Sequence, residues 1–97
     1  MSKNKSKTTT NSEVETRLFH ERYLRAVNNP LRRQILVALN KGSSTIHELA
    51  TITGLDDFTL RWHLSILEYG FCIEKQDNQG TLVYTLTQEG KVVNYIK

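Results

Sequence analysis

Apolar residues recur at roughly helical spacing through residues 13–27, which predicts a first helix there. Ser12 and Glu15 stand three residues apart at its start, the spacing of a capping box. The apolar set is broader than a stripe that only covers a small core, and comprises Val14, Leu18, Phe19, Tyr23, Leu24, Ala26 and Val27. Part of this helix is therefore expected to face a second copy of the chain.

Two capping signals predict the next two helices. Asn29 is a favourable N-cap before Pro30 at the first helical position, and the apolar stripe that follows ends near Gly42. Thr45 and Glu48 form a second capping box, which predicts the start of a short third helix.

A fourth helix is predicted over residues 57–69. Gly54 ends the third helix, Asp56 or Asp57 caps the fourth, and Gly70 is expected to close it in the left-handed conformation. At 100° per residue, one side of this helix carries the leucines that should face the core, namely Leu60, Leu64 and Leu67.

Strand-like alternation follows in residues 71–76 and 81–86, and residues 77–80 supply turn chemistry between them. Thr87 is expected to cap a final helix, although Gly90 lies in its first turns. The order of elements predicts a mainly α fold with a small β-hairpin (α+β). This is a winged helix-turn-helix with about five helices and a two-stranded wing over residues 71–86.

Length and composition limit the alternatives. The 97 residues, 38% of them hydrophobic, are enough for one small domain, assigned here to residues 13–97. Residues 1–12 contain one apolar residue and three lysines, which predicts a flexible basic tail. No apolar run is long enough to span a bilayer or resembles a signal peptide, so no membrane association and a cytoplasmic location are expected.

Cysteine and histidine usage predicts neither a disulfide nor a metal site. Cys72 is the single cysteine, and the three histidines are scattered. The chain also lacks a glycine-rich phosphate loop and a Ser/His/Asp or Cys/His arrangement, so an enzyme is not expected. No cofactor and no small-molecule effector are predicted.

Charge is distributed unevenly along the chain, whose net charge is +3. Residues 1–12 carry +3 and residues 13–41 another +3, whereas residues 42–97, with four basic and seven acidic side chains, carry −3. A basic chain suggests a polyanionic partner, but an acidic helix-turn-helix counts against simple DNA binding, because phosphate neutralisation supplies most non-specific affinity.

In a helix-turn-helix the second helix lies in the DNA major groove. On the outer side of residues 57–69, the residues expected to contact DNA are Thr59, Arg61, Trp62 and Ser65. Arg61 is the best candidate for a guanine contact, whereas Trp62 is left open between groove contact and packing. Ile66 and Tyr69 are expected to pack, and His63 to be hydrogen-bonded between helix and core.

Other candidate DNA contacts lie outside this helix. They are Arg32 and Arg33 at the start of the second helix, Thr45 at the start of the third, and Lys75, Asn78 and Gln79 in the wing. One of the two arginines has the alternative of an internal ion pair.

Four segments resemble ArsR-like winged-helix transcriptional regulators: NPLRRQILVALNKG (29–42), TIHELATITG (45–54), LRWHLSILEYGF (60–71) and VYTLTQEG (83–90). The resemblance implies a homodimer that joins through its first and last helices and binds a two-fold-related operator in double-stranded DNA. The residues that this arrangement assigns to the dimer interface are Leu18, Phe19, Val92, Val93 and Ile96. The metal-sensing members of this family carry their sensor cysteines on the helix that corresponds to residues 46–53. These residues hold no cysteine here, so the resemblance implies no metal sensing through that helix.

Two functions remain. The first is a sequence-specific DNA-binding transcriptional regulator. The second is a protein-interaction winged helix that docks a partner on the apolar outer face of residues 57–69, which the local −3 charge would suit.

Overall fold

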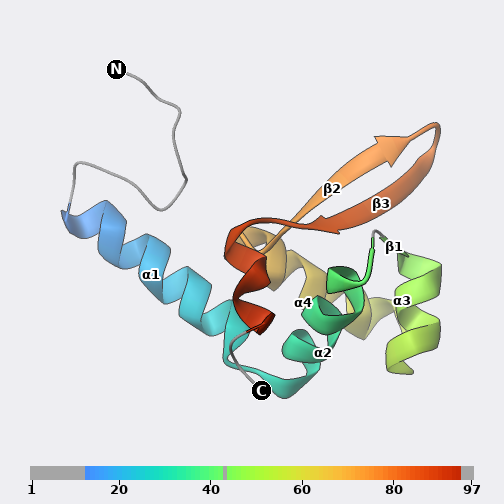
Figure 1. Cartoon of the computed structure of the whole chain (residues 1–97), viewed down its shortest axis with the longest axis horizontal. Helices are drawn as coiled ribbons and strands as arrows, with labels where there is room; N and C mark the ends of the chain where they lie inside the picture. The colour runs from blue at the N-terminus through green and yellow to red at the C-terminus, as the bar shows by residue number, and fades with distance from the viewer. Residues whose placement is uncertain (1–12, 43, 95–97) are drawn as a thin grey trace.

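The computed structural model describes residues 13–42 and 44–94. These residues form four α-helices, a three-stranded antiparallel sheet and a short 3₁₀ helix (Figure 1). In chain order the elements are α1 (Glu13–Val27), α2 (Pro30–Asn40), β1 (Ser44–Thr45), α3 (Ile46–Thr53), α4 (Asp57–Tyr69), β2 (Ile73–Asn78), β3 (Thr81–Leu86) and η1 (Glu89–Asn94). Within these ranges no helix is long and apolar enough to cross a membrane.

The helix boundaries follow from local capping. The Asn29 side chain accepts hydrogen bonds from the backbone amides of Leu31 and Arg32, which fixes the start of α2. At α3, the Thr45 hydroxyl accepts from the Glu48 amide while the Glu48 carboxylate accepts from the Thr45 amide, as the capping box predicted. Gly54 ends α3 with φ 76°. Ser12 lies outside the described residues.

The hairpin of β2 and β3 extends away from the helices as a wing (Figure 1). Its loop has only two residues, Gln79 (φ 58°) and Gly80 (φ 89°), because Asn78 already pairs with Thr81. Two consecutive positive φ angles match the twist of the flanking strands. The Asp77 carboxylate accepts a hydrogen bond from the Gly80 amide and stabilises the turn.

The predicted two-stranded wing gains a third strand at its base. Ser44 pairs with Tyr84 and Thr45 with Val83, so the sheet order is β1-β3-β2. This two-residue strand joins the start of α3 to the wing, and the sheet thereby fixes one relative to the other.

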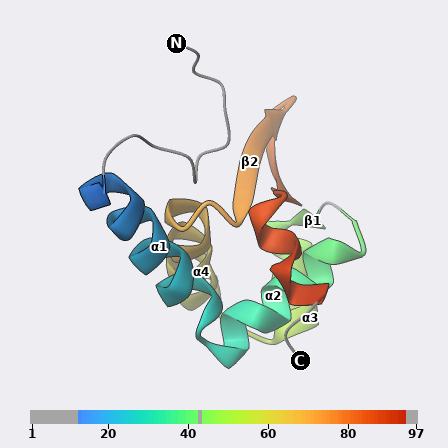
Figure 2. The ribbon, with the colours of Figure 1, turned by 60° about the vertical axis from the view of Figure 1, so that its left-hand side comes forward.

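One apolar core lies between the helices and the base of the sheet. Its largest fully buried side chains are Ile35, Leu36, Leu49, Leu60, Leu64, Leu67 and Ile73. Leu60, Leu64 and Leu67 are 0–2% exposed, so the predicted inner side of α4 is confirmed. Helices α1 and α4 pack side by side (Figure 2).

The prediction about the conformation of Gly70 at the end of α4 is wrong. Gly70 has φ −90°, and the left-handed residue is Phe71 at φ 66°. The expected final helix is present as the 3₁₀ helix η1, and the Thr87 hydroxyl accepts a hydrogen bond from the Gly90 amide at its start. At α4, Asp56 holds the N-cap position but its side chain makes no capping bond.

Candidate nucleic-acid interface

The outer face of α4 exposes large aromatic side chains. Phe58 is 79% exposed, Trp62 50% and Tyr69 58%. Ile66 is only 7% exposed, so its expected packing is found, whereas the expected packing of Tyr69 is partial. This helix therefore presents a surface with more apolar area than an ordinary solvated helix face.

The polar residues expected to contact DNA make local contacts on α4. The Arg61 Nε donates to the Asp57 carboxylate at 2.8 Å, and both side chains are exposed. The Ser65 hydroxyl donates to the Trp62 carbonyl at 2.7 Å, and Thr59 is half-buried. An exposed ion pair at this spacing contributes only about 0.3–0.5 kcal/mol, so Arg61 can exchange Asp57 for another anion at little cost.

Arg32 does not lie where a phosphate could reach it. It is 6% exposed, and its guanidinium donates to the carbonyls of Ala26 (3.0 Å) and Arg25 (2.9 Å) and to His63 Nδ1 (3.1 Å). Burial lowers its pKa, and Arg25 lowers it further. The phosphate role expected for Arg32 is therefore replaced by a structural one, in which a single cation joins the end of α1 to the middle of α4.

His63 takes the position between helix and core that the sequence suggested. Its Nδ1 must accept from Arg32, because a guanidinium can only donate, so the ring is neutral. Burial, and then the charge of Arg32, lower the pKa of His63. The ring also meets the Trp62 ring edge to face, with centroids 5.0 Å apart.

Arg22 joins α1 to α4 through contacts that the sequence did not predict. Its guanidinium lies 3.8 Å from the Tyr69 ring centroid, 4.5 Å from that of Phe71 and 5.5 Å from that of Phe19. Its Nε donates to the Tyr69 carbonyl at 3.1 Å. Only the i, i+3 spacing of Phe19 and Arg22 is a local signal, because the other two rings lie far along the chain.

The remaining candidates lie in or near the wing and at the start of α2. Arg33 donates to the Val27 carbonyl at 2.9 Å, and Lys75 lies 3.7 Å from the Glu68 carboxylate. Asn78 and Gln79 are exposed at the wing tip. Thr45 is occupied as the cap of α3, and its hydroxyl there serves as an acceptor.

The dimer candidates are only partly described. Leu18 is 50% exposed on α1, whereas Phe19 packs against Phe71 with ring centroids 4.4 Å apart. The side chains of Val92 and Val93, and all of Ile96, lie outside the described residues.

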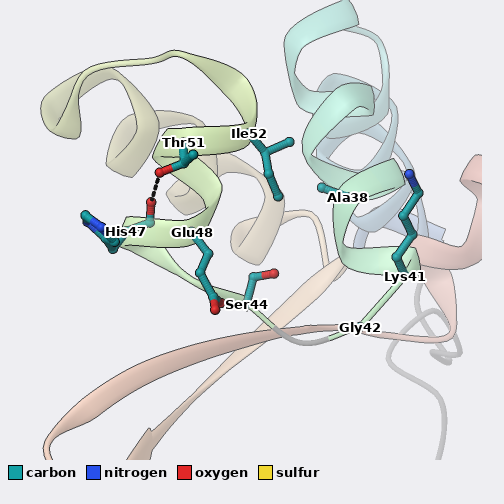
Figure 3. Close-up of a pocket in the computed structure, with 8 residues that line it drawn as sticks. All are labelled: Ala38, Lys41, Gly42, Ser44, His47, Glu48, Thr51 and Ile52. Carbon is teal, nitrogen blue, oxygen red and sulfur yellow. Dashed lines mark hydrogen bonds between the residues drawn. The ribbon is translucent and has the colours of Figure 1, made fainter.

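A pocket of about 530 Å³ lies between α2 and α3 (Figure 3). Lys41 and His47 stand on opposite sides of it, and the Glu48 carboxylate is held by the cap of α3. These groups do not converge on one point, as a catalytic site would require. Within the described residues, no group of three or more His, Cys, Asp or Glu side chains is placed to hold a metal ion.

Residues 29–69, which include α2, α3 and α4, match the arsR family of bacterial regulatory proteins. Over these residues the chain is similar to that family, and its fold is a winged helix-turn-helix. No curated protein sequence is significantly similar to it.

Several solved structures have the same fold. NolR from Sinorhizobium fredii is 25% identical, with a TM-score of 0.74 over 90% of this chain and 89% of that one. The homodimeric DNA-binding domain of a possible ArsR-family regulator from Mycobacterium bovis is 24% identical, with a TM-score of 0.77 over 90% and 80%. The transcriptional repressor BigR from Xylella fastidiosa is 24% identical, with a TM-score of 0.70 over 90% and 92%.

Proposed function

We propose that this ArsR-like protein is a sequence-specific transcriptional regulator that binds double-stranded DNA as a homodimer. Helix α4 enters the major groove, and the β2–β3 wing lies beside it along the phosphate backbone. The observation that carries the proposal is the exposed outer face of α4, which follows the capped helix α3 and lies next to a projecting hairpin.

Arg61 is the side chain that we assign to base recognition. It lies in the first half of α4, it is exposed, and its partner Asp57 lies on the same helix. Breaking the exposed ion pair with Asp57 costs little free energy. A bidentate contact from Arg61 to guanine O6 and N7 gives about 1–3 kcal/mol of discrimination against other bases. The contacts to the DNA phosphate backbone are assigned to Arg33, Lys75, Asn78 and Gln79.

The test is binding to short duplexes from the region upstream of the protein's own gene, measured by fluorescence anisotropy at several salt concentrations. Wild type is expected to bind one duplex preferentially, and Arg61→Ala to lose about 5- to 150-fold in affinity for that duplex alone. Lys75→Ala serves as the control, since it should lower the affinity for all duplexes equally. Equal, weak binding to every duplex contradicts the proposal.

The dimer is assigned to α1 together with the C-terminal segment. Leu18 and Leu24 are large apolar side chains on α1 that are 50% and 42% exposed, and a covered interface would remove them from water. Leu18→Asp is expected to halve the solution mass measured by light scattering while leaving the circular dichroism spectrum unchanged. The matched control is Val37→Asp on α2, which is 46% exposed and should leave the mass unchanged.

A protein-interaction module is the second candidate, favoured by the apolar face of α4 and the net −3 charge of residues 42–97. The two functions differ in the effect of deleting residues 1–12. If that deletion abolishes all DNA binding and no duplex is preferred, lysine-tail attraction accounts for the binding and the interaction module is the better explanation.

A further inference from the structure

Trp62 is exposed, yet its ring is supported from beneath by two buried groups. The His63 ring meets it edge to face at 5.0 Å between centroids, and the Arg32 guanidinium lies 5.9 Å from its centroid. His63 and Arg32 are hydrogen-bonded to each other and are only 4% and 6% exposed. The indole is therefore held in place while half of its surface faces solvent, which is the arrangement of a preorganised contact residue.

Phe58 lies one helical turn before Trp62 on the same side of α4 and is 79% exposed. Tyr69, at the other end of this face, is 58% exposed and has the Arg22 guanidinium over its ring. Phe58 and Trp62 are therefore the exposed aromatic side chains of the N-terminal half of the helix, which is the half that meets base edges in a helix-turn-helix.

The nearby cation does not compete for this position. Arg61 pairs with Asp57, four residues before it on the adjacent side of α4, and Phe58 and Trp62 are two exposed aromatic side chains one helical turn apart. In the major groove, the base edges offer hydrogen-bonding groups and a single apolar group, the C5-methyl of thymine.

We propose that Phe58 and Trp62 form an apolar edge that recognises thymine C5-methyl groups in the operator, with Trp62 positioned by the buried Arg32–His63 pair. This inference rests on the proposed DNA-binding function and specifies its ligand chemistry. It predicts a site with at least one thymine in each half that contributes through its methyl group.

The experiment begins with selection of the best-bound duplex from a randomised library by the full chain. Each thymine of that duplex is then replaced singly by deoxyuridine, which removes the methyl and keeps the base pair. Loss of one buried methyl is expected to weaken wild-type binding about fourfold at the recognised positions and not elsewhere. Replacement of the same thymine by 5-bromodeoxyuridine, whose bromine resembles a methyl in size, is expected to restore binding.

Three variants assign the effect to these side chains. Phe58→Ala and Trp62→Ala should bind the selected duplex more weakly and no longer distinguish thymine from deoxyuridine at their positions. Ile52→Ala is the matched control, because Ile52 is an apolar side chain of α3 that is 53% exposed, and it should keep the full fourfold discrimination.

The chain has a single tryptophan, so fluorescence excited at wavelengths that its four tyrosines do not absorb reports on Trp62 alone and tests the role of the buried pair. His63→Asn keeps an acceptor near the position of Nδ1 and is expected to retain the methyl discrimination. His63→Leu removes the acceptor, so it should increase acrylamide quenching of Trp62 and reduce the discrimination, with far-ultraviolet circular dichroism confirming the fold.

The possible outcomes distinguish the proposed DNA-binding function from the proposed thymine-methyl contact. If the selection returns no preferred duplex, DNA recognition itself fails and the methyl contact fails with it. If a duplex is selected but wild type tolerates deoxyuridine at every position, the regulator stands and the thymine-methyl contact is overturned. If Phe58→Ala and Trp62→Ala retain discrimination, other residues recognise the methyl groups.

Discussion

Cys72 lies between the end of α4 and the start of β2, with no exposed surface. Burial, aided by the charge of Glu89, raises the pKa of the thiol to about 12. Thiolate is the nucleophilic form, so Cys72 should resist reaction with Ellman's reagent in the native protein at pH 8. The same measurement in 6 M guanidinium chloride should show one reactive thiol per chain. Rapid native labelling would show that the segment opens readily.

His63 makes the stability of the fold depend on pH. Its pKa in the folded protein lies below the ordinary value of 6.5, so the unfolded chain binds the proton more tightly. The free energy of unfolding contributed by the neutral ring is therefore fully present above pH 6.5 and is lost as the pH falls from there toward the lower folded pKa.

The expected result is a lower urea midpoint at pH 5.5 than at pH 7.5. His63→Asn, which does not titrate, should reduce this difference, and His47→Asn, an exposed control, should not. An equal difference in all three proteins would place the pH dependence elsewhere.

The side of a helix that faces the core was easier to predict from the sequence than the hydrogen-bond partners of its polar residues. The inner leucines of α4 follow from periodicity alone, whereas the partners of Arg32 do not, because His63 and the Arg25 carbonyl are brought to it only by the packing of three helices. An arginine at the start of a helix has the same local sequence whether it faces a phosphate or a carbonyl. Arg22 is a second example, since Tyr69 is 47 residues away.

At the scale of elements, Gly70 allows α1 and α4 to approach each other. A Cβ added there would lie 2.6 Å from Ala26 Cβ and 2.7 Å from the Arg22 carbonyl oxygen. Gly70→Ala must therefore push α1 away, and overpacking of this kind typically costs about 1–3 kcal/mol. Chemical denaturation of Gly70→Ala should show this loss in the free energy of unfolding.

Gly54→Ala is the informative comparison, because an added Cβ meets nothing within 4 Å there and only the φ of 76° is unfavourable. It should cost about 1 kcal/mol, within the range for an L residue forced into the left-handed region. If Gly70→Ala were as mild as Gly54→Ala, the contact between α1 and α4 would be more deformable than the packing indicates.

Elements with local signals, including the wing hairpin with its turn residues, were predicted well, whereas β1, which has no local signal, was not. Asn29, Thr45 and Glu48 act within a few residues of themselves, so the starts of α2 and α3 could be derived from sequence. Strand β1 has two residues and exists only because Tyr84 and Val83 lie opposite them. No periodicity can appear in so short a segment.

At the scale of the whole molecule, several of the basic side chains that could contact DNA make internal contacts in the folded protein. Arg22 is stacked among aromatic rings, Arg32 is buried, and Arg33 is bonded to a backbone carbonyl. The exposed basic side chains of the described residues before Gly42 are reduced to Arg17, Arg25 and Lys41. The rest of the described chain is net acidic, so long-range attraction to phosphates should be weak.

This distribution predicts a shallow salt dependence of DNA affinity. If each protomer neutralises two to four phosphates, the plot of log affinity against log salt should have a slope of about −2 to −4 per protomer. Deleting residues 1–12, which carry three lysines, should make the slope shallower by up to about 3 if the tail lies on the backbone, and leave it unchanged otherwise. Arg61→Ala is the comparison, because a residue that reads a base should lower affinity for the selected duplex with little change in slope. A slope near −8 per protomer that persists after this deletion would require more cations than the described surface exposes, and would mean that the bound protein releases Arg22 from its internal contacts.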